Sequence, residues 1–279
     1  ADSSASRSSE PDYQEPEAKE IEMPRFGMVI NLQKCVGCGC CTLACKAENN
    51  TRTRAKGQSH NWADLVMKTE GTFPSVTHWV MPVLCNHCTD APCVAACPVT
   101  PKAMFKTPEG VTMHNDALCI GCRACQNACP YSHAELDAKS LNGETYSVIS
   151  FNPPEGSTQP QWSDKSAMIA GCTASGAETA KMAGAATPAM NQFAAGADVD
   201  PIRRAGVVEK CTFCYHRTSN GLQPACVVVC PAKARIFGDQ DDPNSEIAKV
   251  LKTEKSFRLK EDRKTRPNVH YIGKYSARA

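Results

Sequence analysis

The chain has 279 residues, which is enough for one or two domains. It carries 31 Lys and Arg against 29 Asp and Glu, so its formal charge is only +2 and no basic surplus points to nucleic acid. No run of about 18 apolar residues occurs, so no segment is predicted to span a membrane. Aromatic residues make up 6%, whereas 18 residues are Cys. This composition favours a core built around bound metal, with metal binding supplying part of the folding free energy.

The chain begins with a polar segment. Residues 1–25 are rich in Ser, Glu and Pro and lack apolar periodicity, so we expect an extended tail that does not fold alone. The Ser-rich start after Ala1 is typical of a chain trimmed behind an export signal, which favours a periplasmic location. Removal of an initiator Met is the other interpretation, and it would leave the cytoplasmic face open.

Short elements alternate with loops along the rest of the chain. Apolar patterns and turn residues predict, in chain order, a strand at 28–32, a helix at 42–48, a hairpin of 103–106 with 111–113, a small-residue helix near 167–186, a strand at 234–237 and a helix to about 251 with Pro243 at its first position. Residues 51–75 are polar and receive no assignment. The segments 132–147 and 153–206 look like surface insertions, and the basic stretch from Lys252 is either a solvated face or a docking surface for an acidic partner.

Sixteen of the cysteines fall into four groups of four. Groups one and three are spaced C-x2-C-x2-C-x3-C, group two is C-x2-C-x4-C-x3-C and group four is C-x2-C-x11-C-x3-C. The members in chain order are Cys35, Cys38, Cys41 and Cys45; Cys85, Cys88, Cys93 and Cys97; Cys119, Cys122, Cys125 and Cys129; Cys211, Cys214, Cys226 and Cys230. Because four thiolates hold one cubane, the sixteen predict four [4Fe–4S] clusters as cofactors. Several redox centres in one chain indicate a conductor of electrons.

The spacing also predicts the fold class. A tight loop lets three thiolates wrap one face of a cluster, and the x3 step begins a helix that carries the fourth toward a neighbour. Groups two and three flank the predicted hairpin as in a two-cluster ferredoxin. Groups one and four must then pair across the sequence, since each lacks another donor for its fourth position. We expect an α+β, loop-rich fold of two bacterial-ferredoxin-like modules, the inner one inserted into the outer one.

This arrangement divides the chain into five segments. They are an extended tail (1–25), the first part of the outer module (26–80), the inner module (81–152), an insertion (153–206), and the second part of the outer module with a C-terminal tail (207–279).

Other cysteine chemistries fit less well. Zinc ribbons use paired CxxC knuckles and need no further cysteine at x3. Disulfides suit exported proteins, but cysteines on one tight loop seldom pair with each other. Covalent haem requires C-x-x-C-H, and no CxxC pair here is followed by His.

Several residues near the four groups are not predicted to be cluster ligands. Cys40 is interpreted as a small buried side chain and Cys172 as an inert thiol in the second insertion. His87 lies inside group two, where four cysteines are already present, so we expect a loop side chain. Three cations beside ligands either tune cluster potentials or are ordinary solvated side chains; these are Lys34, Arg123 and Lys210.

Over residues 25–275 the chain resembles the four-cluster iron–sulfur subunits of the complex molybdoenzymes related to dimethyl sulfoxide reductase. The resemblance rests on the order of the four groups, on Lys46-Ala47-Glu48-Asn49, on Leu84 to Cys88 with Ala91-Pro92-Cys93, and on Lys210 to Cys214 with Ala225-Cys226. The stretch from Arg25 to Cys38 is most similar to small subunits of respiratory arsenate reductases and arsenite oxidases. An insertion at 132–147 and Cys40, where glycine is common, depart from that branch.

The resemblance implies a crossed set of cluster ligands. These would be Cys35, Cys38 and Cys41 with Cys230; Cys211, Cys214 and Cys226 with Cys45; Cys85, Cys88 and Cys93 with Cys129; and Cys119, Cys122 and Cys125 with Cys97. It also implies a non-catalytic subunit that transfers electrons between a molybdopterin (bis-pterin Mo or W) catalytic subunit and a quinone-reactive membrane subunit or soluble carrier. The complex would be an anaerobic respiratory oxidoreductase for arsenate or arsenite, polysulfide, thiosulfate, tetrathionate or a similar substrate. The outer pair would lie near the catalytic subunit. An independent iron–sulfur enzyme and a zinc-stapled scaffold are the rival interpretations.

Overall fold

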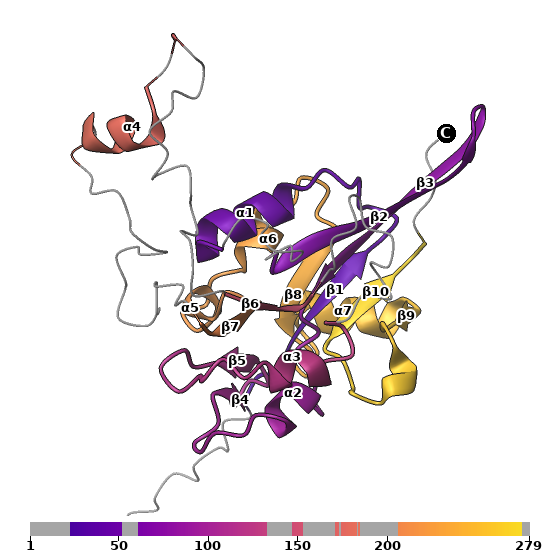
Figure 1. Ribbon diagram of the computed structural model, residues 1–279. Coiled ribbons are helices and arrows are strands. Elements are labelled where there is room, and N and C mark those ends of the chain that lie inside the picture. Colours follow the sequence, from indigo (N-terminus) through magenta and orange to yellow (C-terminus); the bar gives the residue numbers. More distant parts are fainter. Residues whose placement is uncertain are drawn as a thin grey trace, which may run out of the picture.

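The computed structural model describes residues 23–51, 61–132, 147–152, 171–172, 174–182, 184 and 206–274. The predicted tail up to residue 22, most of the two predicted insertions and residues 275–279 lie outside these ranges. The described part mixes short helices with small sheets, which agrees with the α+β class (Figure 1). Within it, no helix is long and apolar enough to cross a bilayer.

The central sheet joins the two ends of the chain. Its strand order is β8-β1-β10-β9, with β1 parallel to β10 and antiparallel to β8. The bounds are β1 Phe26–Asn31, β8 Arg235–Asp239, β9 Ser256–Phe257 and β10 Val269–Ile272. The predicted strands at 28–32 and 234–237 are therefore confirmed. Met28, Val29 and Ile30 are completely buried, because one side of the sheet faces the cysteine-rich core and the other faces a helix.

That covering helix is α7, Glu246–Thr253. Ile247 packs against Val29 and Ile272, which buries the apolar side of the helix on the sheet. The helix is as predicted, but Pro243 is not its first residue. Instead Ser245 caps it by accepting a hydrogen bond from the backbone N–H of Ala248 at 3.1 Å, because a serine hydroxyl can accept from a free N–H of the first turn and a proline side chain cannot.

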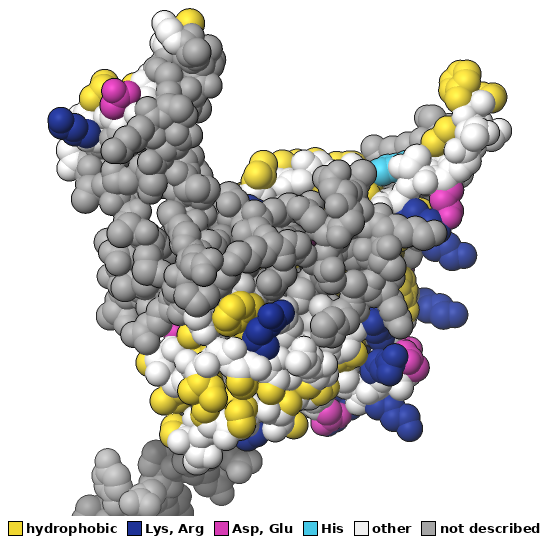
Figure 2. Space-filling model, viewed as in Figure 1, with side chains coloured by type: hydrophobic (Ala, Val, Ile, Leu, Met, Phe, Trp, Pro, Cys, Tyr) yellow, Lys and Arg dark blue, Asp and Glu magenta, His cyan; other side chains and the backbone are white. Residues whose placement is uncertain are grey.

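A long hairpin extends from the body and was not predicted. Its strands are β2 Ala63–Thr72 and β3 Ser75–Leu84, paired along their whole length. Figure 1 shows it projecting beyond the central sheet, and Figure 2 shows hydrophobic side chains at its end. Phe73 at the turn is 93% exposed. The signal in the sequence was the turn at 71–74 between two runs rich in β-branched and apolar residues.

The remaining elements are short, and several of them carry or flank the grouped cysteines. They are α1 Cys40–Asn49, α2 Pro92–Ala95, β4 Met104–Lys106, β5 Thr112–His114, α3 Ala124–Ala128, β6 Ile149–Phe151, α4 Gly176–Met182, β7 Val208–Lys210, α5 Tyr215–Thr218, α6 Ala225–Val228 and the 3-10 turn η2 Glu261–Arg263. The predicted hairpin is β4–β5, and the predicted helices near 42–48 and 167–186 are represented by α1 and α4. Helix α1 packs on α6, and α2 packs on α3.

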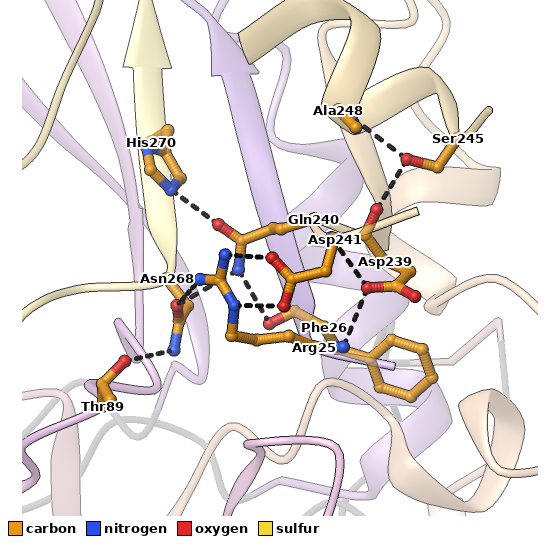
Figure 3. A network of polar contacts seen from close by, with 10 residues as sticks. All are labelled: Arg25, Phe26, Thr89, Asp239, Gln240, Asp241, Ser245, Ala248, Asn268 and His270. Atoms are coloured by element: carbon orange, nitrogen blue, oxygen red, sulfur yellow. Dashed lines mark hydrogen bonds and ion pairs between the residues drawn. The ribbon is translucent and has the colours of Figure 1, made fainter. Parts of the chain in front are cut away.

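A polar network fixes the chain where it enters the sheet (Figure 3). The guanidinium of Arg25 donates to both carboxylate oxygens of Asp241, at 2.7 and 2.6 Å. Beside it, Gln240 donates to Asn268 Oδ1 at 3.1 Å and contacts His270 Nε2 at 2.9 Å. The network therefore ties the residue before β1 to the end of β8 and to β10, which are distant in the sequence.

The basic C-terminal stretch is mainly a solvated face. Figure 2 shows Lys and Arg side chains gathered on the side of the molecule where Figure 1 places β9 and the turn that follows it. Lys252, Lys255 and Lys264 are exposed, whereas Arg266 pairs with Asp90 in the loop after group two.

Candidate metal centres

Every cysteine group has the same local frame, a tight loop that leads into a short helix. The helix begins one residue before the third cysteine in each group; these helices are α1, α2, α3 and α6. Two positions after the first cysteine, a residue in left-handed conformation donates its backbone N–H to that cysteine's sulfur. These donors are Gly37, His87, Gly121 and Phe213. The loop thus supplies hydrogen bonds that stabilise a thiolate.

The grouped cysteines meet in four places, which we name sites I to IV. Site I contains Cys35, Cys38, Cys41 and Cys230; site II contains Cys45, Cys211, Cys214 and Cys226; site III contains Cys85, Cys88, Cys93 and Cys129; site IV contains Cys97, Cys119, Cys122 and Cys125. Each site combines the first three cysteines of one group with the last cysteine of another. These are the sets that the resemblance implies.

The four sites form a row. Helix α1 carries Cys41 of site I and Cys45 of site II. Helix α6 carries Cys226 of site II, and Cys230 of site I follows just after its end. The two helices pack together. Helices α2 and α3 relate sites III and IV in the same way. Sites II and III are neighbours as well. Burial raises the pKa of Cys211 in site II, and Cys85 of site III lies close enough to raise it further. The order is therefore I, II, III, IV.

Burial changes along this row. All eight cysteines of sites II and III are buried. At the ends, Cys38 of site I and Cys122 of site IV are exposed. A group bound at either end would lie near the surface, whereas a group bound in the middle would be enclosed by protein.

Two of the four sites surround hollows in the protein. The cysteines of site I line one open hollow, and those of site IV line another. Among the described residues, no three Cys, His, Asp or Glu side chains converge closely enough to hold one metal ion. A cubane needs four thiolates set apart around a cage, and these hollows with their N–H donors fit that requirement.

Burial holds several of the thiols in their protonated form until metal binds. Burial raises the pKa of Cys88 and of Cys125 to about 12 and that of Cys226 to about 11. Burial also raises the pKa of Cys45 well above its usual value, and the neighbouring thiols of site II raise it further. Because a ligand must be a thiolate, iron binding at these sites has to release protons.

Comparison with known proteins identifies the family. Residues 76–145 and 200–240 match the 4Fe-4S dicluster domain, which covers groups two, three and four. The chain is 44% identical over 256 residues to the arsenate respiratory reductase iron–sulfur subunit of Shewanella sp. strain ANA-3, covering 91% of this chain and 98% of that one. The chain belongs to the iron–sulfur subunits of the dimethyl sulfoxide reductase-type molybdoenzymes.

Two further relatives carry the names of different reductases. A tetrathionate reductase subunit of Salmonella typhimurium strain LT2 is 32% identical, with 89% of this chain and 72% of that one covered. The iron–sulfur cluster-binding subunit of menaquinone reductase from Nitratidesulfovibrio vulgaris strain Hildenborough is 32% identical, with 92% and 91% covered. The chain is thus an electron-transfer iron–sulfur subunit of a respiratory oxidoreductase.

His87 of this subunit is fully buried, which the sequence did not indicate. Its Nδ1 accepts the backbone N–H of Thr112 at 3.1 Å, so the ring proton lies on Nε2. Nε2 is buried without a described hydrogen-bond partner. Burial lowers the pKa of His87 well below its usual value, and the charges of Lys210 and Lys106 lower it further. The imidazole is therefore neutral.

The three cations considered from the sequence have different environments. Lys34 and Arg123 are exposed, and Arg123 lies over the ring of Phe151, 5.1 Å from its centroid. Lys210 is only 1% exposed. A fourth cation, Arg235 at the start of β8, was missed because it was interpreted only as a strand residue. It is buried and donates to Cys41 Sγ at 3.5 Å, between sites I and II.

The two ungrouped cysteines also differ from each other. Cys40 is only partly buried, contrary to the expectation of a small buried side chain, because α1 begins at this residue and turns it toward the hollow of site I. Cys172 is exposed, as suits a surface thiol.

Proposed function

We propose that this subunit holds four [4Fe–4S] clusters, one at each of sites I to IV, and carries single electrons between two partner proteins. The crossed ligand sets are those of the four sites. The burial order supports this proposal most strongly. Exposed cysteines at both ends allow exchange with a partner on each side, and buried cysteines in the middle keep solvent away from the internal steps.

The nested arrangement of two ferredoxin-like modules is part of the proposal. Pairing of β1 with both β8 and β10 supports an outer module assembled from 26–80 and 207–279, with the inner module at 81–152 between these parts. The exchange of last cysteines between groups two and three supports an inner module that is complete in itself.

For the partners, we propose a molybdenum or tungsten bis-pterin catalytic subunit at site I and a quinone-reactive membrane subunit, or a soluble carrier, beyond site IV. Apolar side chains support both contacts. Val36 and Leu43, near Cys38, are 41% and 69% exposed, and Ile120, near Cys122, is 67% exposed. Exposed apolar groups beside an opening are typical of docking surfaces.

We propose arsenate, or arsenite in the reverse direction, as the substrate of the complex. The reason is that this chain aligns with nearly the full length of the arsenate respiratory reductase iron–sulfur subunit at 44% identity. We also propose a periplasmic position, with membrane attachment through the partner. Protease treatment of spheroplasts should then digest the subunit while intact cells protect it.

Metal analysis of the anaerobically isolated complex tests the cluster proposal. Four cubanes require about 16 iron atoms and about 16 acid-labile sulfides per chain. A value of about 12 or less in complex with full electron-transfer activity would contradict the number of four. Zinc in place of iron would contradict the function. Assay of the co-isolated catalytic subunit with arsenate and with tetrathionate tests the substrate separately.

A further inference from the structure

Lys210 is a buried ammonium at the centre of the row. It ends β7 directly before Cys211, and its Nζ donates to the carbonyl oxygens of Thr112 and Cys211, both at 2.5 Å. Among the described residues, no carboxylate forms an ion pair with it. Two neutral carbonyls do not offset the free energy of removing a full charge from water. A negative charge has to come from elsewhere.

Cysteines of site II and of site III lie on the two sides of Lys210, and they carry negative charge only as thiolates. Burial raises the pKa of Cys211 in site II and of Cys93 and Cys129 in site III. The charge of Lys210 acts in the opposite direction and lowers the pKa of all three, because it favours their thiolates. The ammonium therefore lies between sites II and III, the two sites whose cysteines are all buried.

Lys106 on β4 places a second cation at the same gap. Its Nζ donates to the carbonyl oxygen of Cys88 at 2.9 Å and to Thr112 Oγ1 at 3.2 Å, so both lysines bind Thr112. Cys85, Cys88 and Cys93 lie close enough to Lys106 for their thiolate forms to favour its charge. Two ammonium groups that repel each other inside a protein require a strong negative charge nearby.

We propose that Lys210, with Lys106, is the internal counter-charge of sites II and III and raises the reduction potential of the clusters held there. This inference rests on the proposed function of the four sites. A fixed cation favours the reduced, more negative state of a nearby cluster, and it acts more strongly where water is excluded.

A purely structural role would be a latch between β7 and β5. Removing the latch would weaken folding but leave the potentials unchanged. The chain contains a matched control for the charge itself. Lys34 precedes Cys35 as Lys210 precedes Cys211, but Lys34 is exposed, so water and salt screen its charge.

The test is an EPR-monitored redox titration of the intact complex with Lys210→Met, Lys210→Arg or Lys34→Met, each checked for iron and sulfide. In Lys210→Met we expect two of the four clusters to show an about tenfold lower ratio of reduced to oxidised form at fixed ambient potential, which is about 59 mV for a one-electron couple. Lys210→Arg should restore most of the ratio, and Lys34→Met should change it less than about twofold. Unchanged ratios in a fully loaded Lys210→Met complex, or an equal effect of Lys34→Met, would overturn the inference.

Lys106→Met decides the matter if Lys210→Met does not assemble. It should lower the same ratio in at least one of the two inner clusters by about threefold, because Lys106 is less enclosed. No change would overturn the inference. Too few clusters in the wild-type complex would defeat the proposed function instead, so the two failures are distinguishable.

Discussion

The rings of His87 and Phe213 lie stacked with their centroids 3.6 Å apart and their planes 21° from parallel. Both residues occupy the same place in a C-x2-C loop, directly before the second cysteine, and both have positive φ, 43° and 53°. The corresponding residues of the other two loops are Gly37 and Gly121, for which this conformation is favourable. The two strained residues thus face each other across the gap between sites II and III. We infer that the stack offsets the backbone strain and fixes the inner loops together.

Phe213→Ala should therefore destabilise the subunit strongly. Phe213 is 1% exposed, so truncation leaves a cavity as well as removing the stack, and a loss of about 3–5 kcal/mol is expected. Loss of cluster absorbance in a guanidinium titration gives the midpoint. Phe257→Ala is the control, because Phe257 also stacks, on Tyr271 at 5.5 Å, but is 39% exposed. Equal midpoint shifts for the two variants would contradict a special role of the inner stack.

Local patterns in the sequence predicted the elements that depend on local residues. The strand at 28–32 and the strand at 234–237 have buried apolar side chains, and the helix that ends near 251 has one apolar side, so their periodicity is visible. The arm of β2 and β3 is different. From Lys68 to His78 every residue is exposed, so no buried side imposes an alternation.

The cysteine spacing also predicted the loops and helices of the sites, since each group is local. What it could not predict is the environment of residues whose partners are distant in the chain. Lys34 and Lys210 have the same place before a cysteine, yet one is exposed and the other is buried by β5. Similarly, nothing near Arg235 in the sequence indicates that it contacts Cys41.

Paired cysteine variants test the crossed ligand sets by counting iron. Cys38 and Cys230 belong to site I in our proposal, so Cys38→Ala, Cys230→Ala and the double variant should each lose the same cluster, about four iron atoms. Cys38→Ala combined with Cys45→Ala should lose about eight, because Cys45 belongs to site II. If the first double variant loses eight and the second loses four, the crossing is wrong.

His270 should make the stability of the subunit depend on pH. Burial lowers its pKa to about 4, and the charges of Arg258 and Arg25 lower it further, whereas the unfolded value is 6.5. The folded state binds fewer protons than the unfolded state between these values. His270 therefore does not reduce the stability of the folded subunit above pH 6.5, where it is neutral in both states. As pH falls from 6.5 toward 4, protonation in the unfolded state lowers the free energy of unfolding. From pH 7.5 to pH 5.5 the loss should be about 1 kcal/mol.

Thermal midpoints of the wild type and His270→Gln at both pH values measure this term. The variant should lose less stability on acidification than the wild type, because glutamine does not titrate. Equal losses in the two proteins would show that other groups cause the pH dependence.

The two ends of the row should bind different partners, and charge introduced at each end can separate them. Leu43 lies on α1 beside site I, and Ile120 lies between Cys119 and Cys122 of site IV. Leu43→Glu should reduce co-isolation of the catalytic subunit at least about tenfold, because a carboxylate cannot be desolvated at an apolar contact without a partner. Ile120→Glu should retain the catalytic subunit and lose the electron acceptor or donor on the other side. Each variant controls for the other, since both replace an exposed apolar residue and both should keep the iron content of the wild type. Loss of the same partner in both variants would contradict the assignment of the two ends.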